Sequence, residues 1–288
     1  MGCGTALVTP FKNGEVDFNS LREMVRRQVR NGVDFLLPLG TTGETPCLTN
    51  EERIEVLKVT KECAGSCPVI VGGGTNSLAD TVASIKVLEP YGPDAFLIVV
   101  PYYNKPTQEG QYQYFKAVAQ STDKPIILYN VPGRTGANML PATCLRLASE
   151  IPNIVAVKEA SGNYNQVSAI LRDAPSDFHV LSGDDDMTLA FMATGAVGVI
   201  SVASNIAPLQ VSKMVHSALK GDFATARELH HRLSPLFKAC FIESNPVPAK
   251  AALSQMGLCC NELRLPLTPA CADTEAVMAR VLKDLKLF

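Results

Sequence analysis

The chain has 288 residues, of which 47% are hydrophobic and 19% are charged, and its formal net charge is −2. This composition is typical of a globular protein with a large core, and the absence of a basic cluster argues against binding to nucleic acid or to a membrane surface. No stretch approaches the about 18 apolar residues of a membrane span, and no charged leader opens the chain, so we expect a cytoplasmic protein. The nine cysteines are an odd number in a long chain, which favours reduced thiols over a disulfide framework.

Short apolar runs alternate with amphipathic segments along the first 221 residues. The eight predicted strands are 3–9, 33–39, 69–72, 95–99, 125–130, 154–158, 178–182 and 197–201. The helices that follow them, in the same order, are 20–31, 50–64, 78–88, 109–120, 141–149, 164–172, 187–194 and 208–220. Strands that alternate with helices pair in parallel through right-handed crossovers. Eight such units predict the α/β class and a closed (β/α)8 TIM barrel. The first strand is not followed by a Gly-x-Gly-x-x-Gly motif, which weighs against a dinucleotide-binding sheet.

The rhythm changes after about residue 221, where the strands stop. Three segments, 222–240, 247–256 and 273–285, have the spacing of helices and are separated by Pro and Gly. We therefore predict a (β/α)8 catalytic barrel over residues 1–221 and a small C-terminal helical domain over residues 222–288.

The sixth predicted strand ends in a lysine. The four residues before Lys158 are all apolar, as in a strand that is buried on both faces. Burial disfavours the ammonium form, lowers the lysine pKa and makes a neutral amine available for imine chemistry on a carbonyl substrate. The alternative is a structural lysine that extends to solvent from the strand end or pairs with Glu159.

Active sites of (β/α)8 barrels lie at the C-terminal ends of the strands, and several unusual residues follow predicted strands here. The second strand ends in Gly40-Thr-Thr-Gly-Glu44, a loop whose backbone N–H groups and two hydroxyls suit a small carboxylate, although a plain turn is the alternative. Tyr129 closes the fifth strand, and Arg134 follows on a Gly-rich turn, where it could hold a carboxylate or pair with an acid at the rim.

Two further strand ends allow more than one interpretation. Tyr102 and Tyr103 follow the fourth strand on a Pro-flanked loop, where tyrosine is usually a surface or interface residue. Asp184–Asp186 follow the seventh strand, and they could bind Mg²⁺ or cap the next helix. We favour capping and predict no metal site, because no carboxylates at neighbouring strand ends complete one.

Taken in order, these strand-end segments resemble the dihydrodipicolinate synthase family, which belongs to the pyruvate-dependent class I aldolase superfamily together with N-acetylneuraminate lyase. The resemblance covers essentially the whole chain. The segments that carry it are Gly40-Thr-Thr-Gly-Glu44, Pro101-Tyr-Tyr-Asn104, Tyr129-Asn-Val-Pro-Gly-Arg-Thr-Gly136, Val157-Lys-Glu-Ala160, Ser182-Gly-Asp-Asp185 and Asn245-Pro-Val-Pro248.

The resemblance implies a Schiff base between Lys158 and pyruvate, with no cofactor, and condensation with L-aspartate-4-semialdehyde on the diaminopimelate route to lysine. Tyr129 would relay protons. Thr42, beside Thr41, would hold the pyruvate carboxylate and link Tyr129 to Tyr103, a phenol donated across a dimer interface.

The remaining implied roles concern the second substrate and the assembly. Arg134 would bind the carboxylate of the semialdehyde, and Gly183 and Ile200 would line the site through backbone carbonyls. The family further implies a homotetramer built from tight dimers. Open alternatives are another pyruvate-dependent aldolase, of the N-acetylneuraminate lyase or 2-keto-3-deoxygluconate type, and a non-catalytic barrel that binds a keto acid.

Members of this family that are inhibited by lysine bind it at the dimer interface. The corresponding effector pocket here would include Asn76 and Tyr102, which match the family, and Arg53 and Asp80, which depart from it. A guanidinium is a poor neighbour for a cationic ligand, so we predict weak or absent inhibition by lysine.

Overall fold

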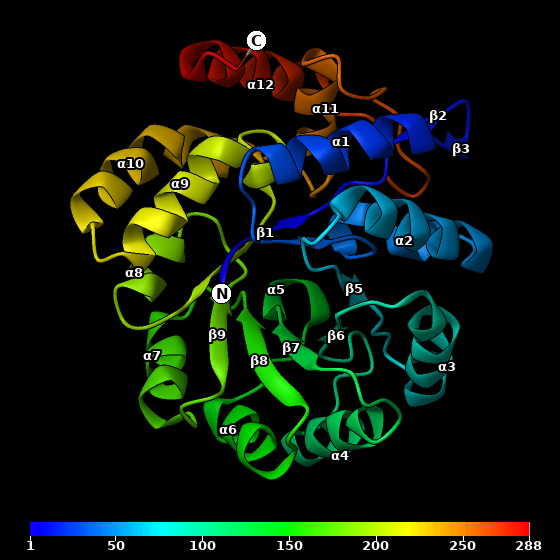
Figure 1. Cartoon of the computed structure of the whole chain (residues 1–288), viewed down its shortest axis with the longest axis vertical. Coiled ribbons are helices and arrows are strands. Elements are labelled where there is room, and N and C mark those ends of the chain that lie inside the picture. The colour runs from blue at the N-terminus through cyan, green and yellow to red at the C-terminus, as the bar shows by residue number, and fades with distance from the viewer. Residues whose placement is uncertain (288) are drawn as a thin grey trace.

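The computed structural model describes residues 1–287 and confirms the (β/α)8 barrel (Figure 1). Bridging between Leu36 and Val69 closes the ring between β4 and β5, and β1 pairs with both β4 and β10. The eight parallel strands are β1 (Gly2–Ala6), β4 (Phe35–Leu37), β5 (Ile70–Gly72), β6 (Ala95–Val99), β7 (Ile126–Asn130), β8 (Ile154–Glu159), β9 (His179–Ser182) and β10 (Gly198–Ser201).

An outer ring of helices surrounds the strands, as the alternating pattern predicts (Figure 1). Thr49 and Glu52 form a capping box that starts α2 at the predicted residue. The helices of the ring are α1 (Phe18–Arg30), α2 (Asn50–Ala64), α3 (Leu78–Leu88), α4 (Gln108–Ala119), α6 (Pro141–Glu150), α7 (Tyr164–Asp173), α8 (Thr188–Met192) and α9 (Pro208–Leu219).

Short elements lie outside the prediction. Strands β2 (Phe11–Lys12) and β3 (Glu15–Val16) form a hairpin whose turn residues, Asn13 and Gly14, both have positive φ. Asn-Gly is a strong hairpin signal, but strands of two residues are too short to show an alternating pattern. Helix α5 (Pro132–Thr135) is a single turn and carries no periodicity either.

The interior of the barrel explains where Lys158 points. Ala156 of β8 belongs to the cluster of side chains that fills the barrel, whereas Val157 packs in the layer between strands and helices. Side chains alternate along a strand, so Lys158 faces inward at the C-terminal end of β8, and Glu159 faces outward. Register places Lys158 between Tyr129 of β7 and Leu181 of β9.

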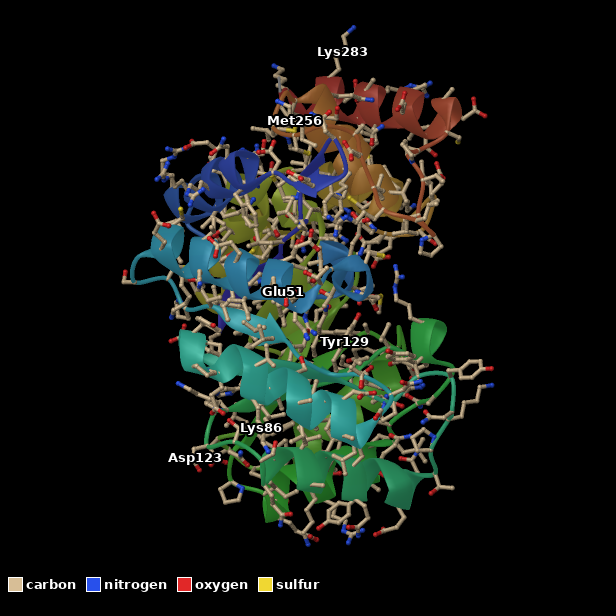
Figure 2. All side chains as sticks on the ribbon, turned by 90° about the vertical axis from the view of Figure 1, so that its right-hand side faces the viewer. Glu51, Lys86, Asp123, Tyr129, Met256 and Lys283 are labelled. Carbon is tan, nitrogen blue, oxygen red and sulfur yellow. The ribbon has the colours of Figure 1, made fainter. Side chains whose placement is uncertain are left out.

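Three helices follow the barrel: α10 (Phe223–Ala239), α11 (Val247–Gln255) and α12 (Ala272–Leu285). Helix α10 packs on α9 and α12, and α11 packs on α12 and contacts the turn after β10. Figure 2 shows Tyr129 near the middle of the molecule and Lys283 extending outward from α12. Among residues 1–287, no helix has the length and apolar character needed to cross a membrane.

Candidate active site

Lys158 is the centre of the site. Its side chain is only 6% exposed, and within residues 1–287 it has no ion-pair partner. Burial lowers the pKa of Lys158 to about 8, against the opposing influence of Asp184 and Asp185. Glu159 does not pair with it, because that carboxylate lies on the other face of the strand, where it accepts hydrogen bonds from Asn130 and from other polar groups. In the described part of the chain, Lys158 is therefore a desolvated amine that forms no salt bridge.

Tyr129 lies directly beside this amine. The Lys158 Nζ is 4.2 Å from the centroid of the Tyr129 ring, and the tyrosine is only 9% exposed. Burial raises the pKa of Tyr129 to about 12, although the Arg134 guanidinium opposes that shift. The phenol therefore carries its proton at neutral pH and can both donate and accept a hydrogen bond.

A cavity of about 60 Å³ brings most of the predicted residues together. It is lined by Thr41, Thr42, Tyr129, Arg134, Lys158, Gly183, Asp184 and Asn245, with apolar walls from Ala6, Leu37, Gly40, Leu97, Val131, Ala160, Val202 and Phe241. At Gly183 a Cβ atom would lie 2.6 Å from the Cβ of Ala160 and 3.1 Å from the Cε of Lys158. The absence of a side chain at this position leaves room for the lysine.

The two threonines of the Gly40–Gly43 loop have different surroundings. Thr41 is exposed and lines both this cavity and a larger neighbouring one. Thr42 is only 3% exposed, lines the small cavity alone, and its Oγ1 accepts a hydrogen bond from Asn245 Nδ2 at 2.9 Å. The structure thus separates a hydroxyl at the cavity mouth from a hydroxyl held beside the lysine.

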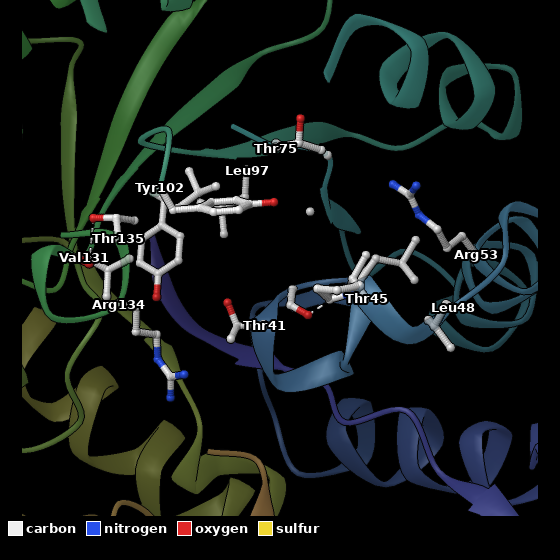
Figure 3. Close-up of a pocket in the computed structure, with 18 residues that line it drawn as sticks. Thr41, Thr45, Leu48, Arg53, Thr75, Leu97, Tyr102, Val131, Arg134 and Thr135 are labelled. Carbon is white, nitrogen blue, oxygen red and sulfur yellow. Dashed lines mark hydrogen bonds between the residues drawn. The ribbon is translucent and has the colours of Figure 1, made fainter. Parts of the chain in front are cut away.

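The neighbouring cavity has a volume of about 390 Å³ (Figure 3). Arg134 and Tyr102 lie on one side of it, Arg53 and Leu48 on the other, and Thr41 between them. Arg53 and Tyr102, two of the residues predicted for an effector pocket, both line this cavity. The other two residues predicted for that pocket, Asn76 and Asp80, do not line it.

Two predicted site residues lie outside both cavities. The Tyr103 side chain is 88% exposed, and its backbone has a φ of 71°. It cannot reach the lysine pocket of its own chain in this conformation. Ile200 is completely buried among the side chains that fill the barrel and borders neither cavity.

The aspartates after β9 act differently from the prediction. Asp185 accepts hydrogen bonds from Ser201 Oγ and from the backbone N–H groups of Val202 and Ala203, so it caps the turn after β10. The expected capping of α8 is wrong, because that helix has no side-chain cap. Asp184 borders the small cavity, and burial raises its pKa to about 6. No cluster of three potential metal ligands occurs in the described part of the chain.

Asn245 is the site residue that analysis of single strand ends missed. It lies after α10, 203 positions from Thr42 in the sequence, and it is only 5% exposed. Its backbone oxygen also accepts a long hydrogen bond of 3.5 Å from Arg134. The motif Asn245-Pro-Val-Pro248 was the available signal, but nothing local indicates that it reaches the barrel mouth.

The amino-acid sequence is similar to that of enzymes with a known name. The chain is 50% identical over 287 residues to the 4-hydroxy-tetrahydrodipicolinate synthase of Thermotoga neapolitana, with 98% of each chain covered. It is 51% identical to the enzyme of the same name from Koribacter versatilis, covering 97% of this chain and 94% of that one.

Solved structures and a family model agree with these relatives. The crystal structure of dihydrodipicolinate synthase from Thermotoga maritima superposes with a TM-score of 0.98 at 48% identity, covering 100% of this chain and 99% of that one. The Aquifex aeolicus enzyme gives 0.97 at 47% identity, with 99% and 98% covered. Residues 1–285 match the model described as the dihydrodipicolinate synthetase family. The chain therefore belongs to the dihydrodipicolinate synthetase family.

Proposed function

We propose that Lys158 forms an imine with pyruvate and that the resulting enamine attacks L-aspartate-4-semialdehyde. The observation that carries this mechanism is a buried lysine that makes no salt bridge within residues 1–287, has a pKa of about 8 and faces a cavity at the C-terminal end of the barrel. A neutral amine adds to a carbonyl, and loss of water then leaves a protonated imine. This cation accepts the electrons of a C–H bond at C3 of pyruvate while the C3 proton leaves along the hydrogen-bonded chain that begins at Tyr129, which gives the nucleophilic enamine.

The chain has the activity of its full-length relatives, 4-hydroxy-tetrahydrodipicolinate synthase, a lyase-type aldolase of lysine biosynthesis. Within that activity we assign proton transfer to Tyr129. A phenol with a pKa of about 12 is a poor free base, so it works as a link in a chain of hydrogen bonds. We assign Thr41 as the next group of the chain, because it lines the small cavity together with Tyr129 and opens into the larger one.

The remaining polar groups suit the two substrate carboxylates. Thr42 lies beside Lys158 in the small cavity, where its hydroxyl and the adjacent backbone would hold the carboxylate of pyruvate. Arg134 lines both cavities and would bind the carboxylate of the semialdehyde. Gly183 would contribute backbone to the pyruvate pocket, and we keep the backbone carbonyl of Ile200 as a proposed contact beneath it.

We further propose a cytoplasmic homotetramer built from tight dimers. The exposed Tyr103 has no role in its own pocket, and as a relay group it would have to enter the site of a second copy. Residues 222–288 would form a helical unit on the barrel, with residue 288 outside the described residues. Sedimentation that shows only monomers at assay concentration, with full activity, would contradict the role of Tyr103.

The reaction is tested by giving the enzyme pyruvate and then one of several partners. We expect turnover with L-aspartate-4-semialdehyde and slow or no cleavage of N-acetylneuraminate or 2-keto-3-deoxygluconate. Arg134 supports this choice, because a fixed guanidinium selects a carboxylate at that position. Faster turnover of a sugar acid would overturn the assignment of the acceptor.

A further inference from the structure

The segment after the barrel touches the pyruvate pocket through Asn245. This residue is 5% exposed, its Nδ2 donates to Thr42 Oγ1 at 2.9 Å, and its backbone oxygen lies 3.5 Å from the Arg134 guanidinium. Asn245, which lies outside the strands, thereby contacts both Thr42 and Arg134, the two residues that we propose to bind the substrate carboxylates.

The direction of the hydrogen bond between Asn245 and Thr42 matters chemically. An amide nitrogen only donates, so the Thr42 oxygen must accept, and the threonine keeps its own hydrogen for another partner. Thr42 lines the cavity that contains Lys158, and a hydroxyl with a free hydrogen there is a donor for an anion. Without Asn245 the hydroxyl could rotate and present its lone pairs to a carboxylate instead.

The backbone of the same loop is held from the same segment. Glu44, which ends the loop, has a φ of 51°, a left-handed conformation that is unfavourable for a residue with a Cβ atom. Lys250 Nζ lies 2.5 Å from the Glu44 carboxylate, with both side chains completely buried, and the Arg264 N–H donates to that carboxylate at 3.1 Å. The segment 245–264 therefore fixes both the hydroxyl and the backbone of the loop.

We propose that Asn245 is a positioning residue that orients the Thr42 hydroxyl as a donor to the carboxylate of pyruvate. The buried pair of Glu44 and Lys250 keeps the loop in the conformation that makes this contact possible. The proposal rests on the proposed function, since it needs pyruvate bound beside Lys158.

The test measures the pyruvate concentration at which half of the protein is trapped by borohydride as a Lys158 adduct. We expect N245A and T42V each to raise this concentration about 10-fold, because T42V removes the proposed hydrogen bond to the pyruvate carboxylate and N245A removes the group that orients it. The double variant should lie within about 2-fold of T42V, because Asn245 acts through the hydroxyl that T42V has already lost.

A second variant tests the direction of the hydrogen bond. N245D has almost the same volume, but its carboxylate can only accept, so it should take the hydrogen of Thr42 and bind pyruvate at least as weakly as N245A. Q255A is the matched control, since Gln255 lies at the end of α11 and donates to Glu275, away from the loop. It should be trapped at the same pyruvate concentration as the unaltered protein.

The outcomes separate this inference from the function beneath it. If the unaltered protein forms no adduct, the proposed function falls and this inference falls with it. If the unaltered protein is trapped, but N245A and N245D are trapped at the same concentration as it is, Asn245 does not position Thr42. Fully additive effects of N245A and T42V would overturn the inference as well, and melting curves identify any variant that is unfolded.

Discussion

Two buried lysines in this chain have opposite surroundings. Lys158 ends a barrel strand, is 6% exposed and lacks an ion-pair partner among residues 1–287. Lys250 lies in α11, is fully buried, and has the Glu44 carboxylate at 2.5 Å, the Glu262 carbonyl oxygen at 2.9 Å and the Phe11 ring centroid at 4.1 Å. Burial lowers the pKa of both. Asp184 and Asp185 oppose the shift at Lys158 without forming an ion pair with it, whereas Glu44 opposes the shift at Lys250 through a direct ion pair.

The comparison shows that burial alone does not make a lysine reactive. A paired ammonium with satisfied hydrogens is held in its charged form and serves to join two parts of the molecule. An unpaired amine beside a cavity loses its proton more readily and has a free path to a substrate carbonyl.

Replacement of Lys158 should separate activity from folding. In Lys158→Ala we expect catalytic turnover to fall at least about 1000-fold, the scale seen when a covalent nucleophile is removed. Stability should not fall, because the buried amine makes no ion pair whose loss would cost energy. Steady-state kinetics and circular dichroism measure the two effects, and a lost dichroism signal would indicate a structural lysine instead.

Replacement of Lys250, in contrast to that of Lys158, should lower the stability of the protein. Lys250→Met leaves the Glu44 carboxylate buried without its partner, and we expect a loss of about 3–5 kcal/mol in the free energy of unfolding. Part of the loss should return when Glu44→Gln is added. Lys283→Met on the exposed face of α12 is the control, with an expected change within about 0.5 kcal/mol. If urea unfolding gave the same free energy of unfolding for Lys158→Ala and Lys250→Met, the two buried lysines would not differ in their structural role.

The pH dependence of adduct formation should follow the pKa of Lys158. Only the neutral amine attacks the carbonyl, and with a pKa of about 8 roughly a tenth of it is neutral at pH 7. The initial rate of trapping at low pyruvate concentration should therefore rise about 10-fold from pH 7 and level off above about pH 9. A rate that keeps rising to pH 10.5 would show that Lys158 titrates like an exposed lysine.

A third cation, Arg53, should prevent inhibition of the enzyme by lysine. Its guanidinium donates to Ser84 at 2.5 Å and to Asn50 at 3.4 Å, and it borders the larger cavity. We expect sub-millimolar lysine to change the rate by less than about 2-fold, because a positive ligand would approach a fixed positive charge. Initial rates with and without added lysine check this, and strong inhibition would show that Arg53 does not exclude it.

The barrel and its reactive strand end could be predicted because their signals are local. An all-apolar run before Lys158 and repeated strand–helix units need no knowledge of distant contacts. Tyr129 at a strand end, and Arg134 and the threonine loop after predicted strands, could be singled out for the same reason, whereas Gly183 was assigned to the site only through the family resemblance.

The contacts that cross the molecule could not be predicted in this way. Asn245 meets Thr42 across 203 positions, and Lys250 finds Glu44 from within a helix whose sequence shows no partner for it. Asp185 follows a strand and precedes a helix, so capping of that helix was the local expectation. Its bonds instead go to the turn after the next strand, which only the closed barrel brings near.

The most direct measurement of the central claim is borohydride reduction with pyruvate, followed by peptide mass analysis. Our account predicts one reduced pyruvate adduct per chain, located on Lys158, and none on Lys250. A protein that remains unmodified while it turns over pyruvate, or an adduct located on another lysine, would contradict the account.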